Sequence, residues 1–118
     1  MNPAGHTLDL FPPDFSGSQE RLVSLLKTRQ VEVLHLSIPR GSRLPVHQAV
    51  GEILFLCLRG HVELSTPGEN LAVRAGQLMY LTAETPVAIE GREDALLVVF
   101  IVAPKAGQNV ELIGEQQS

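Results

Sequence analysis

The chain has 118 residues, enough for one domain with a single hydrophobic core. Its hydrophobic content of 44% and charged content of 19% are ordinary for a folded protein and exclude extended disorder. The formal net charge of −4, with no run of lysine or arginine, excludes the basic face that nucleic-acid binding requires. We therefore predict a single-domain globular protein that does not bind nucleic acid.

The number of cysteines and the N-terminal sequence indicate the cellular compartment of the protein. The single cysteine, Cys57, excludes an intrachain disulfide and a cysteine-rich zinc site. The first residues lack the basic and long apolar regions of a signal peptide, and no apolar run is long enough to cross a bilayer. These features predict a cytoplasmic protein that does not associate with membranes.

The N-terminal part of the chain contains one segment with two interpretations. Residues 1–18 are rich in proline, glycine and polar residues, which predicts an irregular arm, and their apolar side chains indicate that the arm packs on another part of the protein. The following residues, 18–29, fit either a short capped helix or a strand over residues 22–26. We favour the strand, because it would form a hairpin with the clearly extended segment 31–38.

Turn signals become regular after Val31. They recur about every eight to ten residues between short apolar segments, which is typical of an all-β sandwich or barrel. Residues 62–64, 71–73 and 87–89 alternate between apolar and polar positions, as half-buried strands do. We predict an all-β fold with an arm at 1–18, a barrel at 19–104 and a polar tail at 105–118.

Two segments, residues 53–58 and 96–103, are apolar without interruption. A strand that is apolar on both faces must be covered on both faces. In a small barrel one face points to the interior, so the outer face needs the N-terminal arm or a second subunit. Because soluble monomers rarely expose such patches, we predict a homodimer.

The stretch from Gly41 to Gly60 resembles the first sequence motif of the cupins, a family of small jelly-roll β-barrels. That motif reads Gly, five residues, His, one residue, His, three or four residues, Glu, six residues, Gly. Gly41, His47 and Gly60 occupy their positions in it. Residues 74–87 resemble the second motif, in which a glycine and a strand precede Pro-His. The resemblance covers residues 22–103 and implies a cupin-like jelly-roll barrel.

Most metal-ligand positions of this family are replaced here. The resemblance implies His47 as the first ligand, but the second histidine falls on Ala49 and the last one on Val87. The glutamate position falls on Ile53, one residue after Glu52. Side chains alternate across a strand, so Glu52 faces away from the interior unless a bulge at Gly51 redirects it. One imidazole among apolar residues does not complete a transition-metal site, and we predict no metal cofactor.

The same motif positions define a candidate ligand site. We assign to it His47 as the polar anchor, and with it Glu52, Ile53, Phe55, Cys57 and Val87. Glu52 is alternatively a solvated charge at the rim, and Cys57 is alternatively a small buried hydrophobic residue. The alternative is a divalent transition metal, and its protein ligands would then be His47, Glu52 and His35. His35 is otherwise a structural or exposed residue of its strand.

No catalytic triad, cysteine–histidine pair or phosphate-binding loop is visible as a local signature. The sequence therefore favours a barrel that binds a small, partly apolar molecule without catalysis. One alternative is a metal-dependent cupin enzyme of the dioxygenase or isomerase type. Another is a structural module that dimerises through its apolar strands.

Overall fold

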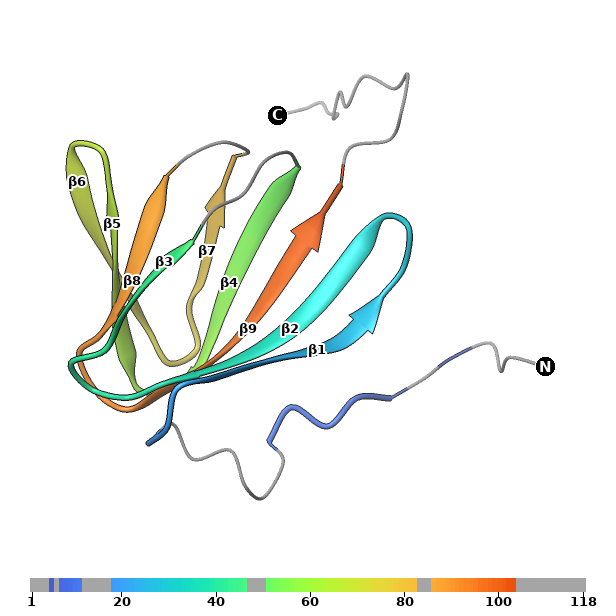
Figure 1. Ribbon diagram of the computed structural model, residues 1–118, viewed down its shortest axis with the longest axis horizontal. Coiled ribbons are helices and arrows are strands. Elements are labelled where there is room, and N and C mark those ends of the chain that lie inside the picture. Colours follow the sequence, from blue (N-terminus) through green and yellow to red (C-terminus); the bar gives the residue numbers. More distant parts are fainter. Residues whose placement is uncertain (1–4, 6, 12–17, 47–50, 83–85, 104–118) are drawn as a thin grey trace.

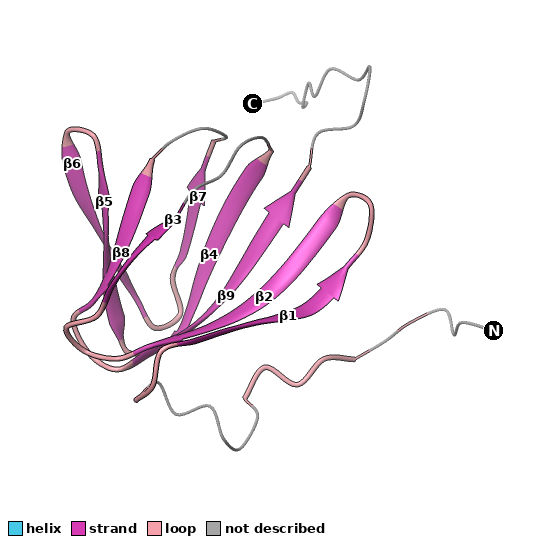
Figure 2. Cartoon of the chain, in the orientation of Figure 1, coloured by secondary structure: helices cyan, strands magenta, loops and turns pink. Residues whose placement is uncertain are grey.

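The computed structural model describes residues 5, 7–11, 18–46, 51–82 and 86–103. Within these ranges the chain forms nine strands in two antiparallel sheets, and it forms no helix (Figures 1 and 2). The all-β prediction is therefore confirmed. None of the described segments is a helix long and apolar enough to span a membrane. The strands are β1 (Arg21–Lys27), β2 (Val31–Ile38), β3 (Arg43–Val46), β4 (Glu52–Arg59), β5 (His61–Thr66), β6 (Glu69–Arg74), β7 (Leu78–Leu81), β8 (Val87–Gly91) and β9 (Ala95–Val102).

The first two strands form the hairpin that we favoured over a helix. β1 pairs with β2 from Arg21↔Ser37 to Lys27↔Glu32. The turn between them is closed by Thr28, whose hydroxyl accepts hydrogen bonds from the backbone N–H groups of Gln30 (3.1 Å) and Val31 (2.9 Å). A threonine hydroxyl that satisfies backbone donors in this way stabilises a tight turn rather than a helix.

Strand β3 is an element that we did not predict, because its sequence lies in a loop-like stretch rich in glycine and proline. It pairs with β8 and lies at one edge of the four-stranded sheet, whose order is β3-β8-β5-β6. Pro45 lies inside it. Proline has no N–H to donate, so it is tolerated at a sheet edge, where one side of the strand has no neighbour. The other sheet has five strands in the order β1-β2-β9-β4-β7.

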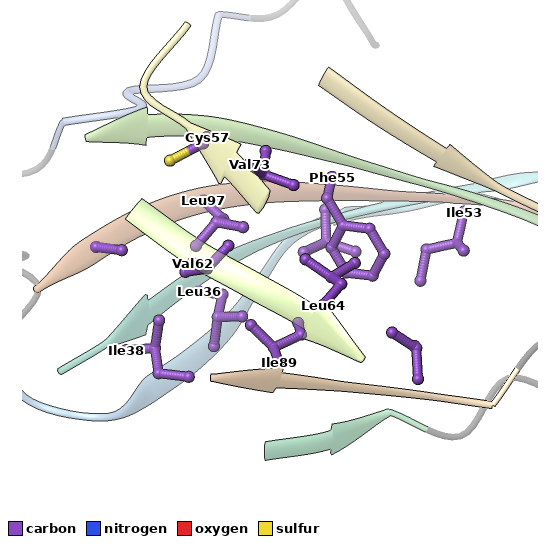
Figure 3. Packing of buried hydrophobic residues seen from close by; sticks show 13 residues of the cluster. Leu36, Ile38, Ile53, Phe55, Cys57, Val62, Leu64, Val73, Ile89 and Leu97 are labelled. Carbon is purple, nitrogen blue, oxygen red and sulfur yellow. The ribbon is translucent and has the colours of Figure 1, made fainter. Parts of the chain in front are cut away.

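The hydrophobic core lies between the inner faces of the two sheets (Figure 3). The predicted alternation is confirmed in β5 and β8, where Val62, Leu64 and Ile89 are all 0% exposed. In β4, the side chains of Ile53, Phe55 and Cys57 point inward. Thirteen buried residues form one continuous cluster: Leu36, Ile38, Ile53, Phe55, Cys57, Val62, Leu64, Val73, Val87, Ile89, Ala95, Leu97 and Val99.

The outer faces of the two sheets differ in polarity. The outer face of the four-stranded sheet is charged: Arg43, Glu90 and Glu63 are cross-strand neighbours, and Arg92 forms an ion pair with Glu63. The outer face of the five-stranded sheet is mainly apolar. Its strand register places two rows of side chains there, Val23–His35–Val98–Leu56–Leu78 and Leu26–Val33–Phe100–Leu54–Tyr80.

The N-terminal arm covers one part of that apolar face. The backbone carbonyl of Leu10 lies 2.8 Å from Nε2 of His35, and the Arg59 guanidinium lies 5.2 Å from the centre of the Phe11 ring. On the neighbouring strand β9, the cross-strand partners of Ser37 and His35, Leu96 and Val98, are 0% exposed. The described residues of the arm therefore pack on side chains of β2 and β4, in agreement with the expectation that the arm packs on another part of the protein. The part of the face over β4 and β7 remains more exposed.

Candidate functional site

The two ends of the barrel differ in how tightly the core is closed. Near the end where β4 finishes and β9 begins, Cys57 and Ala95 are completely buried. At the opposite end, where β4 begins and β9 finishes, several inward-facing apolar side chains are only partly buried. We call this second end the mouth. Among the described residues, those that line its inner surface are Glu32, Val46, Ile53, Leu81, Val87 and Ile101.

Glu32 is the polar residue among the described residues that line this surface, and the sequence analysis missed it. The register pairs Glu32 with Ile101, Ile101 with Ile53, and Ile53 with Leu81, which forms one inner row across four strands. The Ser24 hydroxyl donates a 2.9 Å hydrogen bond to Oε2 of Glu32. This hydrogen bond holds the carboxylate at the border between solvent and the apolar row. The strand parity of β2 was the available signal, but it is ambiguous, because polar residues occur on both of its faces.

The described residues proposed from the sequence lie in three places: at the mouth, deeper in the core and, in the case of Glu52, on the outer face. Ile53 and Val87 lie at the mouth, whereas Phe55 and Cys57 lie deeper in the core. His47 lies outside the described residues. Of the described residues proposed from the sequence, Ile53 and Val87 are therefore the two that lie at the mouth.

Glu52 points away from the interior, as its strand parity requires. It pairs with Val102 at the start of a regular β4–β9 register that shifts only further along, between Cys57 and Arg59. Gly51 therefore introduces no bulge that turns Glu52 inward. This glycine has a φ of 100°, and a Cβ atom there would collide with the carbonyl oxygen of Val102. Gly51 therefore allows its own backbone to approach the backbone at Val102 closely. Glu52 does not belong to the inner site.

His35 also lies on the outer face, where it is completely buried beneath the arm. A carbonyl oxygen only accepts hydrogen bonds, so the 2.8 Å contact with Leu10 assigns the ring proton to Nε2. The histidine thereby fastens the arm to β2. Its role as a substitute ligand inside the barrel is wrong, because the neighbouring Leu36, not His35, faces the core.

A metal does not fit the described residues of the site. Two members of the hypothetical ligand set, Glu52 and His35, face outward, and the motif positions at the mouth hold Ile53 and Val87. Across the described part of the chain, no three histidine, cysteine, aspartate or glutamate side chains are grouped to hold an ion. Glu32 would offer one carboxylate among apolar side chains, which is too few donors for a transition metal.

Cys57 is a buried thiol at the closed end of the barrel. Its Sγ lies 3.3 Å from the backbone carbonyl oxygen of Arg59. Burial raises the pKa of Cys57, the backbone hydrogen bond at Arg59 lowers it, and the Glu93 carboxylate raises it further. The net effect is an increase above the ordinary value, so the reactive thiolate is scarce at neutral pH.

We therefore expect the thiol of the folded protein to resist modification by a disulfide reagent such as DTNB at pH 8. The same reagent should label one thiol per chain after denaturation, because Cys57 is the single cysteine. The release of thionitrobenzoate at 412 nm measures both rates. Complete labelling of the native protein within the time that a free thiol needs would contradict the closed environment of Cys57.

Comparisons with known proteins identify the fold. No protein-family model matches the sequence, and no curated protein matches it either. Solved structures do match. A conserved protein of unknown function from Streptococcus pyogenes aligns with a TM-score of 0.73 and 22% identity over 90% of this chain and 93% of its own. An RmlC-like cupin protein from Desulfovibrio desulfuricans aligns with a TM-score of 0.71 and 20% identity over 88% and 100%.

A third similar structure is described as an RmlC-like cupin with a double-stranded β-helix fold, from Methanocaldococcus jannaschii. It aligns with a TM-score of 0.73 and 17% identity over 86% of this chain and 94% of its own. These identities are low, and what the structures share with this chain is the arrangement of the two sheets. The expectation raised by Gly41, His47 and Gly60 is thus confirmed at the level of the fold. The chain has the cupin fold, a double-stranded β-helix.

Proposed function

We propose that this barrel binds a small, partly apolar molecule at its mouth and does so without a metal. The observation that carries the proposal is the inner row Glu32–Ile101–Ile53–Leu81, in which the partly buried Ile101 and Leu81 and the buried Ile53 adjoin one hydrogen-bonded carboxylate. Small-molecule sites combine an apolar lining with a few fixed polar groups in this way. His47 follows Val46 directly in the chain, and we propose it as a second polar contact.

The carboxylate restricts the chemistry of the ligand. An ionised carboxylate only accepts hydrogen bonds, so the ligand must present a hydroxyl, amine or amide N–H group to Glu32. The apolar part of the ligand would lie against Ile53, Leu81 and Ile101. Lys27 is the cross-strand partner of Glu32, and its positive charge offsets part of the negative potential. We therefore expect neutral donors and cations to bind, and anions to be rejected.

The experiment compares three ligands that share one apolar ring: cyclohexanol, cyclohexylamine and cyclohexanecarboxylate. We expect the first two, at millimolar concentration, to raise the Tm of the protein by a few degrees, and the carboxylate to leave it unchanged. Glu32→Gln should reduce the effect of the amine most, because it removes the charge. His47→Ala should reduce the effect of all binding ligands. Thermal unfolding followed by circular dichroism measures the shifts.

The matched control is Glu93→Gln, which removes an exposed carboxylate from the opposite end of the barrel. It should leave the ligand-induced shifts unchanged. The proposal would be overturned if cyclohexanecarboxylate raises the Tm as much as cyclohexylamine does. It would also be overturned if Glu32→Gln and Glu93→Gln show the same ligand-induced shifts in Tm. One equivalent of bound iron, manganese, nickel or zinc in untagged protein would overturn its metal-free part and favour the enzyme hypothesis.

A further inference from the structure

The residue opposite Glu32 in the β1–β2 hairpin carries the opposite charge. Lys27 is the cross-strand partner of Glu32, and residues directly opposite each other in an antiparallel pair point to the same face of the sheet. The register shift between Ser24 and Leu26 sets this parity: Leu26 pairs with the outward-facing Val33, so Lys27 lies on the inner face. The border of the mouth therefore has an ammonium group beside the carboxylate.

The two charges lie at one side of the mouth, and the other described residues that line it are apolar. From Glu32 the inner row continues through Ile101, Ile53 and Leu81, on strands that lie successively further from the hairpin. Neighbouring strands are about 4.8 Å apart, so the row extends roughly 14 Å from Glu32 to Leu81. Among the described residues, the mouth is thus divided into a charged side over β1 and β2 and an apolar side over β9, β4 and β7 (Figure 1).

The hairpin holds the charged side of the mouth in place. The Ser24 hydroxyl donates a 2.9 Å hydrogen bond to Oε2 of Glu32. In the turn that follows Lys27, the carbonyl oxygen of Gln30 accepts a 2.8 Å hydrogen bond from the N–H of Ala103, which directly follows β9. This contact ties the hairpin to the strand that supplies the first apolar side chain of the row. The separation between the charged side and the apolar side is therefore set by backbone contacts.

We infer that the ligand is a zwitterion of the α-amino acid type, with an ammonium group, a carboxylate and a large aliphatic side chain on one carbon atom; this inference rests on the proposed ligand site. Directly opposite residues have Cβ atoms about 5 Å apart, so two groups on one carbon can reach both Glu32 and Lys27. The ligand's ammonium would donate to Glu32, and its carboxylate would pair with Lys27. The aliphatic side chain would extend over Ile101 and Ile53. A simple amine lacks the second contact, and an anion lacks the first.

Three forms of one amino acid separate the two contacts. L-Cyclohexylglycine has both charges, its amide has only the ammonium group, and its N-acetyl derivative has only the carboxylate. NMR titration of the methyl resonances of Ile53 and Ile101 at low ionic strength measures the three dissociation constants. We expect the amino acid to bind about fivefold more tightly than the amide, which is the contribution of one exposed ion pair. The N-acetyl derivative should cause no saturable shift.

Replacing the ammonium group of the protein tests its role. Lys27→Gln should abolish the advantage of the amino acid over the amide, and it should not weaken the binding of the amide. Arg21→Gln is the matched control, because it removes one positive charge from the same strand, but Arg21 pairs with Ser37 and lies on the outer face. This variant should preserve the advantage.

Two outcomes would overturn the inference: the amide binds as tightly as the amino acid, or Arg21→Gln removes the advantage as completely as Lys27→Gln does. In either case the proposed ligand site itself stands, because the amide still shifts the Ile53 resonance. If none of the three compounds shifts Ile53, the proposed ligand site fails and the inference fails with it.

Discussion

Replacing Phe55 with alanine is expected to lower the free energy of unfolding by about 3–5 kcal/mol, since it removes the largest side chain of the core. Phe55 is 1% exposed and belongs to the core cluster between the two sheets, which includes residues of both (Figure 3). Two costs add up: the apolar ring is lost from the core, and the surrounding strands cannot collapse fully into the cavity. Urea denaturation followed by far-ultraviolet circular dichroism measures the change, because the chain has no tryptophan to report it.

Phe11→Ala is the matched control for this variant. Phe11 is 49% exposed, and the Arg59 guanidinium lies over its ring. Its removal should cost about 1 kcal/mol or less, the usual contribution of a cation–π contact at an exposed site. Equal losses in the two variants would show that Phe55 is not enclosed by the two sheets.

Gly60→Ala is expected to destabilise the protein by about 2–4 kcal/mol. Gly60 forms the turn between β4 and β5 with a φ of 82°, in the left-handed region that other residues avoid. A Cβ atom there would also collide with the carbonyl oxygen of Asp94 and lie 2.8 Å from Cα of Ala95. Because both obstacles are backbone atoms, β9 would have to shift away from the turn.

Gly41→Ala separates the cost of the left-handed backbone conformation from the cost of the steric collision. Gly41 has a similar φ of 87°, but a Cβ atom there meets nothing within 4 Å. Its substitution should cost about 1 kcal/mol, which is the conformational term alone. The difference between the two variants in urea denaturation measures the collision at Gly60. If Gly41→Ala costs as much as Gly60→Ala, the close approach of β9 to the turn is not what requires a glycine.

The sequence was sufficient to predict the class of the fold because its signals are local. Turn residues at regular intervals and the alternation around Val62, Leu64 and Ile89 follow directly from strand geometry. Strand β3 was missed for an equally local reason: four residues that include Pro45 show no pattern distinguishable from a loop. The motif glycines Gly41 and Gly60 do form turns, and this explains why the resemblance gave the correct fold.

The site was predicted less well, because the residues that face the interior are determined by the pairing of strands that lie far apart in the sequence. In β2, the polar residues Glu32 and His35 lie on opposite faces, and nothing in the local pattern shows which of them points inward. Pairing with β9 places Glu32 beside Ile101 at the mouth, and the arm buries His35 on the other side. The same alternation of side chains in β4 places Glu52 on the outer face and excludes it from the inner site. A site built from several strands therefore appears only once their register is known.

Methyl NMR of the protein titrated with cyclohexylamine tests the proposed ligand site most directly. We expect the methyl resonances of Ile53, Leu81 and Ile101 to shift with one common dissociation constant, because these side chains share the inner row next to Glu32. The outward-facing Leu78 should not shift. In Glu32→Gln the same resonances should need a markedly higher amine concentration. Shifts confined to Leu78 and its outer-face neighbours, or no saturable shift at Ile53, would contradict a ligand site at the mouth of the barrel.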